Sequence, residues 1–526
     1  MMFRLQQSYP KYFPLLPYAL LIVAVLLAYA NIYGFEFVYD DLGLIEGNKF
    51  LTSWKYAPTL FTTSILQGHG VSTPFYRPLQ MLLYMFVYQG FGASPAAFHF
   101  LNVLLHISGA CLLYALGVRL GFNRIASFLA VLLWAVHPAH IEAVTYISGT
   151  AGLLGLLFLT AGVYVLVPNF SPKRVGAACL FFVLALLSKE SAVIFPLLAM
   201  GLLFYRSPNR WSPRTYISTW PFWLIAALYL IARGTVLGFD GFYGYYNPTA
   251  ADTLATRLYT FLATLPSYIQ LLVWPTDLHI ERSFPVYQSL LVPQVLGGLV
   301  LLAAAIVCVV YKPSRPATPL AWGLLWAAAT HIPQSGILVP AGVVFYDHWL
   351  HLPMAGLALG LAQSLMLGCK QVRLRQILAG AAVLAAILLG TATFQQNKVW
   401  KDSVTLYTHI LGCGENSVKI RNNLGNYYLK NQQYDLALEQ YKQSLALSDY
   451  SAEAHFSLAA TMLAIGVGPE GVAESEKHIL RALELNPELL PAYDEMALLY
   501  AQLGNGAKES AYRAKAAEIR KKMGID

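Results

Sequence analysis

The chain has few charged residues and few cysteines. Only 12% of its 526 residues are Asp, Glu, Lys or Arg, against the roughly 25% of a soluble domain, which excludes an ordinary soluble protein. The five cysteines show no metal-ligand spacing and three lie inside apolar runs, which argues against a metal centre and a disulfide framework. The first apolar run is too long for a signal-peptide core and shows no obvious cleavage site, so we expect an uncleaved anchor.

Apolar residues dominate instead. They make up 57% of the chain, with a mean hydropathy of +0.52, which is typical of a polytopic membrane protein. A net charge of +8 could suggest a nucleic-acid partner. However, the basic residues are dispersed in short groups between apolar runs, so we expect membrane lipids as partners and no nucleic acid.

The order of charge along the chain predicts its orientation. Basic groups such as Arg4/Lys11, Arg119/Arg124 and Lys312/Arg315 alternate with loops poor in Lys and Arg, which places the N-terminus in the cytoplasm and the loop 34–97 outside. The stretch 257–274 does not fit this alternation, and we interpret it as a re-entrant or surface-lying helix. About eleven crossings are predicted, at 15–33, 98–118, 124–137, 148–167, 175–188, 190–205, 216–236, 291–311, 320–338, 350–368 and 376–394.

The C-terminal part follows a different pattern. After a membrane domain over 1–395 and a helical adaptor over 396–417, residues 418–526 show small and large residues with a period of about 34, which predicts about three tetratricopeptide repeats. The predicted fold is therefore all-α, a membrane helical domain followed by an α-solenoid. The residues at repeat positions are Val418, Leu424, Gly425, Tyr428, Ala437 and Tyr441, then Leu458, Ala459, Met462 and 482–487, then Ala497, Tyr500 and Gly504.

Two neighbouring aspartates, Asp40 and Asp41, are the first candidates for chemistry. They lie a few residues beyond the first apolar run. A carboxylate near a bilayer costs free energy unless it pairs with a cation, binds a metal or transfers a proton, so such a group is a functional candidate. An acidic, solvated loop is the alternative. Arg77 in the same outer loop suits phosphate, because its planar fork donates two parallel hydrogen bonds, although it could instead pair with an aspartate or reach lipid headgroups.

Further polar residues occur in the later outer loops. His137, His140 and Glu142 could bind a metal, but a proline between the histidines favours contact with a headgroup or phosphate. Lys189 and Glu190 interrupt apolar sequence and are expected to have separate partners, the lysine an anion. The last such loop carries Asp347 and His348, which could contact phosphate or pack against the membrane face.

Several of these motifs, in this order, resemble the transmembrane tetratricopeptide-containing O-mannosyltransferases and their bacterial relatives, within the glycosyltransferase C superfamily. They are Tyr-Asp-Asp (39–41), Tyr-Arg-Pro-Leu (76–79), Phe-His-Phe-Leu-Asn-Val-Leu-Leu-His (98–106), His-Pro-Ala-His-Ile-Glu-Ala-Val (137–144) and Ser-Lys-Glu-Ser (188–191), followed by the repeats.

The resemblance implies roles for the candidate residues. Asp40 matches a general base, with Asp41 beside it, and Arg77 matches a position that faces the phosphate of a polyprenyl-phosphate sugar; Lys189 and Arg233 could assist it. Where relatives often have Glu-Arg-Tyr before the late Leu-Pro, this chain has Asp347, His348 and Trp349, so an arginine is missing there. A divalent cation near Asp40 and Asp41 is compatible with the superfamily but not required by it.

The expected function is transfer of a sugar, with mannose as the candidate, to a protein hydroxyl on the non-cytoplasmic side, with the repeats binding the polypeptide acceptor. A single carboxylate base favours inversion. Two alternatives are a non-enzymatic repeat scaffold for envelope or pilus assembly and a transferase that modifies a glycan or lipid. Short outer loops favour a bacterial inner membrane with the site in the periplasm.

Overall fold

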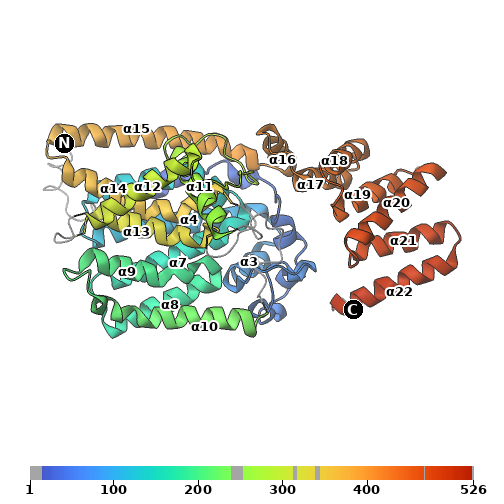
Figure 1. Ribbon diagram of the computed structural model, residues 1–526, viewed down its shortest axis with the longest axis horizontal. Coiled ribbons are helices and arrows are strands. Elements are labelled where there is room, and N and C mark those ends of the chain that lie inside the picture. Colours follow the sequence, from blue (N-terminus) through green and yellow to red (C-terminus); the bar gives the residue numbers. More distant parts are fainter. Residues whose placement is uncertain (1–14, 239–252, 312–316, 338–343, 467, 524–526) are drawn as a thin grey trace. The chain divides into compact units, whose positions relative to one another are not determined.

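The computed structural model describes residues 15–238, 253–311, 317–337, 344–466 and 468–523. Within these ranges all regular elements are helices, which confirms the all-α prediction (Figure 1). The chain divides into two compact units, Met1–Lys401 and Asp402–Asp526. The basic groups Arg4/Lys11 and Lys312/Arg315, on which the predicted orientation partly depends, lie outside the described residues.

The first unit is a bundle of mostly apolar helices joined by short helical turns. Its helices are α2 (Leu16–Ala28), α3 (Pro78–Phe91), α4 (Pro95–Arg119), α5 (Arg124–Ala135), α6 (Ile141–Val144), α7 (Thr150–Leu166), α8 (Pro172–Ser188), α9 (Phe195–Arg206), α10 (Trp220–Thr235), α11 (Leu254–Val273), α12 (Pro293–Val310), α13 (Pro319–His331), α14 (His351–Gly368) and α15 (Val372–Gln396). The turns are η1 (Ile32–Gly34), η2 (Leu42–Glu46), η3 (Lys49–Thr52), η4 (Trp54–Tyr56), η5 (Thr59–Phe61), η6 (Gln67–His69), η7 (Pro138–His140), η8 (Ile147–Gly149), η9 (Glu190–Ile194), η10 (Pro213–Thr219), η11 (Ile332–Gln334), η12 (Asp347–Leu350) and η13 (Asn397–Trp400).

Proline and glycine explain where these helices begin and how closely they pack. Helices α3, α4, α8, α12 and α13 each carry proline in the first turn, where its fixed φ suits a helix and its missing N–H costs nothing. Glycines allow α13 and α14 to approach each other, because a Cβ on Gly323 would lie 2.7 Å from the carbonyl oxygen of Gly356.

The surface of the first unit is apolar where lipid is expected. Large hydrophobic side chains are exposed along α10, α12 and α15, an exposure that a soluble monomer rarely tolerates. Among the described residues six helices are long and apolar enough to cross a membrane, or up to 7 if the bent pair Arg124–Ala135 and Pro138–Val144 is one span. A helix overlaps every predicted span, but the count of about eleven crossings and the placement of α11 stay predictions.

The loop 34–97 folds as a small cap with its own core. Turns η2 to η6 pack with α3 around buried Ile45, Leu51 and Tyr84, and this cluster continues onto Phe98 of α4 and Ile147 before α7. Apolar contacts therefore hold the loop against the bundle, because removing apolar surface from water is favourable in free energy.

The second unit consists of α16 (Ser403–Gly412) and three helical hairpins. In the first hairpin Gly425 allows the ring of Tyr441 to pack closely, because a Cβ at Gly425 would lie 2.6 Å from a ring carbon. This small-against-large contact is the kind that the repeat pattern predicted. The paired helices are α17 (Val418–Lys430) with α18 (Tyr434–Leu447), α19 (Ala452–Ala464) with α20 (Pro469–Leu485), and α21 (Leu490–Gln502) with α22 (Gly506–Met523).

Candidate functional site

The acidic pair lies in a tight turn whose two carboxylates face different surroundings. Tyr39 has a left-handed backbone, with φ 57°, and the π-helical turn η2 begins directly after Asp41. Asp40 is exposed, whereas Asp41 is only 1% exposed. The Asp41 carboxylate accepts the backbone N–H of Ser148 at 2.9 Å and that of Val38 at 3.4 Å. Asp40 is therefore the carboxylate that an incoming hydroxyl can reach.

Burial separates the two acids further. It raises the pKa of Asp41 well above the usual range of a carboxyl, and the backbone N–H groups oppose this only in part. Each Asp41 oxygen accepts one backbone hydrogen bond. A divalent cation at the pair stays a prediction. Among the described residues no group of three or more His, Cys, Asp or Glu side chains is arranged to hold a metal ion.

A chain of hydrogen bonds links this turn to the start of α3. The amide of Gln80 donates to the carbonyl of Ser148 at 3.3 Å and to the Tyr84 hydroxyl at 2.9 Å. The Tyr84 hydroxyl donates to the carbonyl of Ile147 at 2.7 Å. Arg77 directly precedes α3. The network therefore holds Arg77 near Ser148, whose backbone N–H donates to Asp41.

Arg77 forms a bidentate ion pair with Glu190, not with either aspartate. Its Nε lies 3.0 Å from Oε2 and its Nη2 lies 2.7 Å from Oε1, and both side chains are largely buried. The guanidinium also lies 4.7 Å over the ring of Phe75. Burial alone would raise the pKa of Glu190, but the paired guanidinium lowers it to about 2, so this carboxylate is firmly ionised.

Two more cations approach the same carboxylate. Arg233 of α10 is 3% exposed, donates to the carbonyl of Pro74 at 2.5 Å, and adds to the lowering of the Glu190 pKa. Lys189 bonds Ala185 and Ala192 through its backbone. Burial, and then the charge of Arg77, lower the pKa of its ammonium group to about 8. Three of the four expected phosphate ligands therefore lie close to the Glu190 carboxylate, and the fourth, His348, does not.

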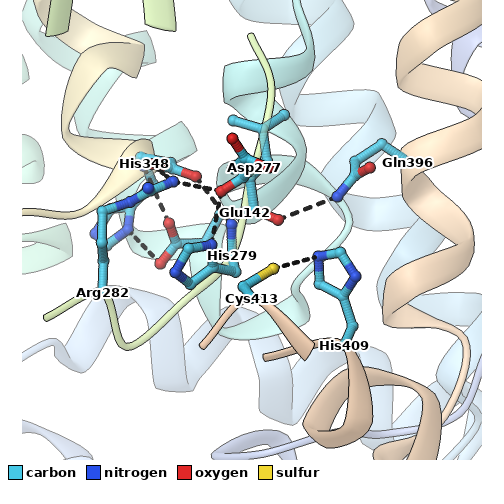
Figure 2. Close-up of polar contacts among 10 residues, drawn as sticks. Glu142, Asp277, His279, Arg282, His348, Gln396, His409 and Cys413 are labelled. Atoms are coloured by element: carbon cyan, nitrogen blue, oxygen red, sulfur yellow. Dashed lines mark hydrogen bonds and ion pairs between the residues drawn. The ribbon is translucent and has the colours of Figure 1, made fainter. Parts of the chain in front are cut away.

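A second charged cluster surrounds His348 (Figure 2). The ring Nδ1 of His348 lies 2.6 Å from one oxygen of Glu142, and its backbone N–H donates to the other at 3.1 Å. Asp347 accepts the backbone N–H of His279 at 3.2 Å and lies 3.3 Å from the guanidinium of Arg282. Asp347 is only 3% exposed.

The two histidines of the 137–144 motif are both buried. His137 accepts the N–H of Ala139 at 3.2 Å and bonds the carbonyl of Leu272 at 3.1 Å, so both of its ring nitrogens are used by backbone. His140 is fully buried and has no hydrogen-bond partner on either nitrogen within the described residues; its ring packs against Trp134 and His351. Their surroundings are those of packing residues rather than of groups that reach a headgroup.

The structure thus brings seven of the eleven predicted site residues into two groups, and Asp40, Asp41, His137 and His140 belong to neither. Arg77, Lys189, Glu190 and Arg233 form one, and Glu142, Asp347 and His348 form the other. Sequence reasoning missed Glu281 and Arg282, which contact Tyr39 and Asp347 respectively. Residues 189–190 were singled out because they interrupt apolar sequence. Residues 281–282 are also an adjacent acid and base, and that pairing is the signal that could have found them.

Several curated proteins with one shared name are similar to this chain. The chain is 24% identical over 514 residues to protein O-mannosyl-transferase TMTC3 of Mus musculus, covering 90% of this chain and 55% of that protein. It is 26% identical to protein O-mannosyl-transferase Tmtc3 of Drosophila melanogaster, over 91% of this chain and 59% of the relative. A Caenorhabditis elegans protein O-mannosyl-transferase, F38B6.6, is 27% identical over 77% of this chain and 59% of its own length.

The chain spans little more than half the length of these curated relatives. No family model matches it. The first two of these relatives nevertheless align with about nine-tenths of this chain. They confirm the resemblance seen in the motifs: the chain is related to the transmembrane tetratricopeptide-containing O-mannosyltransferase family.

Proposed function

We propose that this chain is an integral-membrane glycosyltransferase that moves a sugar, with mannose as the candidate, from a polyprenyl phosphate to a protein hydroxyl. The observation that carries the proposal is the group of three cations, Arg77, Lys189 and Arg233, around the single carboxylate of Glu190. A lipid phosphate at the membrane surface is an anion that guanidinium and ammonium groups bind well, and three such groups gathered in one place suit it.

In the proposed reaction Asp40 removes the proton of the acceptor hydroxyl while its oxygen attacks the anomeric carbon. The bond from that carbon to the phosphate oxygen breaks, and the phosphate leaves with the electron pair. Arg77, Lys189 and Arg233 stabilise the charge that develops on the leaving phosphate. With one carboxylate base and no carboxylate nucleophile required, the configuration at the anomeric carbon inverts.

The proposal extends to the setting of the enzyme. About eleven crossings place the acidic turn outside the cytoplasm, and tetratricopeptide-type hairpins bind the polypeptide acceptor. Tethering a binding unit to the membrane unit raises the local concentration of acceptor near Asp40. A bacterial inner membrane, with the site in the periplasm, is the proposed location.

The test is Asp40→Asn in the full chain, purified in lipid nanodiscs and supplied with radiolabelled polyprenyl-phosphate mannose and acceptor protein. Loss of the base should lower the transfer rate by about 10²- to 10⁴-fold. Glu36→Gln is the matched control, because Glu36 is an exposed carboxylate of the same loop. Transfer by the folded Asp40→Asn protein at the wild-type rate contradicts the assignment, whereas a wild type that is inactive with every lipid-linked sugar favours the scaffold alternative.

A further inference from the structure

Left-handed backbone is concentrated in two segments that contact each other. Among the described residues four non-glycine residues have positive φ, and three of them are Tyr39 at 57°, Asp277 at 55° and Glu281 at 63°. Such a conformation is disfavoured for residues with a Cβ and persists only where surrounding contacts impose it. Tyr39 directly precedes the proposed base, and Asp277 and Glu281 lie in the outer loop between α11 and α12.

The contact between these segments is a hydrogen bond from the Tyr39 hydroxyl to the carboxylate of Glu281. The Tyr39 ring is 8% exposed and packs edge-on against Tyr146, with centroids 6.2 Å apart. Tyr39 is therefore held at its ring and at its hydroxyl. Because Tyr39 and Asp40 share a peptide bond, the contact that keeps Tyr39 left-handed also sets the direction in which Asp40 projects.

Glu281 can act as a fixed point because its segment is anchored on both sides (Figure 2). On one side, His279 and Arg282 bind the two oxygens of Asp347. On the other, the amide of Gln396 at the end of α15 donates to the carbonyl of Leu278 at 3.1 Å. The segment 277–282 thus joins the turn that carries Asp40 to the turn that carries His348.

We propose that Glu281 is a positioning residue for Asp40, acting through the hydroxyl of Tyr39. This inference rests on the proposed glycosyl transfer. Glu281 does not touch substrate; it holds the turn so that the base points at the acceptor hydroxyl. Its removal should lower kcat, since a small misplacement of a base is costly, while donor KM should stay unchanged because the cations around Glu190 are untouched.

The experiment compares Glu281→Ala, Glu281→Gln, Tyr39→Phe and the double variant Tyr39→Phe/Glu281→Ala in nanodiscs. We expect kcat to fall about 10- to 100-fold in Glu281→Ala and Tyr39→Phe. The double variant should lose no more than the worse single variant, because both remove one contact. Glu281→Gln should recover most of the rate, because its amide oxygen still accepts the hydroxyl. Glu36→Ala, an exposed acid of the same loop, is the control.

Hydrogen–deuterium exchange provides a readout that does not depend on activity. The amides of Asp41 and Leu44 are bonded within the turn, to the carbonyls of Val38 and Asp40. They should exchange faster in Glu281→Ala and at the wild-type rate in Glu281→Gln.

The possible outcomes separate this inference from the proposed function. A Glu281→Ala enzyme with wild-type kcat, losses that multiply in the double variant, or a raised donor KM with unchanged kcat would each overturn the positioning role. If the wild type transfers no sugar from a polyprenyl phosphate, the proposed function fails, and exchange alone decides: faster exchange in Glu281→Ala supports the coupling of Glu281 to the Asp40 turn, and unchanged exchange overturns it.

Discussion

Replacing Glu190 with glutamine should weaken the fold and strengthen donor binding at the same time. The side chain keeps its shape and can still accept a hydrogen bond from Arg77. However, the negative charge between Arg77, Lys189 and Arg233 is lost, and the three cations then repel one another at a largely buried place.

The size of the stability effect follows from the pKa of Glu190. Its reduction from 4.5 to about 2 means that the folded state favours the ionised carboxylate by about 3 kcal/mol at neutral pH. Removing one partner of a buried ion pair typically costs about 3–5 kcal/mol, which agrees. Because the folded-state pKa is the lower one, this stabilisation is complete above pH 4.5 and is lost as the pH falls toward 2.

The assay is thermal melting of the purified protein together with donor kinetics. Glu190→Gln should lower the Tm of the membrane unit by about 4–6 °C. It should also lower the donor KM, since Glu190 competes with the lipid phosphate for the cations. Glu36→Gln should change neither quantity. An unchanged Tm would refute the stabilising role of the pair, and a raised donor KM would refute the view that these cations bind phosphate.

Two further predictions concern the second unit. Gly425→Ala should destabilise the first hairpin by about 1–3 kcal/mol in chemical unfolding, because the new Cβ meets the Tyr441 ring at 2.6 Å, whereas Gly412→Ala, with no neighbour within 4 Å, should not. Burial, and then the neighbouring His455, lower the pKa of His478; the two Nδ1 atoms are 2.8 Å apart. The unfolded chain therefore takes up a proton at His478 more readily than the folded unit does. The unit should lose stability as the pH falls below 6.5. Calorimetry at pH 7.5 and 5.5 checks this, and His478→Gln should reduce the difference.

Much of the fold follows from local pattern. Apolar runs of membrane length became helices, and proline marks where several of them begin. The small residue at Gly425 and the large one at Tyr441 meet as their repeat positions predicted. These features depend on residues that are close in sequence, or on a period that the sequence displays directly.

The partners of the charged residues could not be predicted from the sequence, because the two members of each pair are far apart in the chain. Arg77 and Glu190 are separated by 113 residues, and His348 and Glu142 by 206. Any of several carboxylates could have satisfied Arg77, and only tertiary packing selects Glu190. The difference between Asp40 and Asp41 was equally hidden, since Asp41 is buried by tertiary packing and bonds the backbone N–H of Ser148, 107 residues away.

The distribution of charge around the candidate site gives the proposed reaction a direction. On the basic side, the Glu190 carboxylate lies close to Arg77, Lys189 and Arg233. On the acidic side there are four carboxylates and one guanidinium, those of Asp40, Glu142, Glu281, Asp347 and Arg282. The phenols close to Asp40 belong to Tyr39, Tyr146 and Tyr346; burial, and then the neighbouring carboxylates, raise their pKa values well above 10, so they stay protonated. The acidic side therefore holds neutral donors and a carboxylate that can accept a proton, and the basic side attracts the phosphate. A lipid-linked sugar placed between them would present its anomeric carbon toward Asp40 and its leaving group toward Arg77, as the transfer requires.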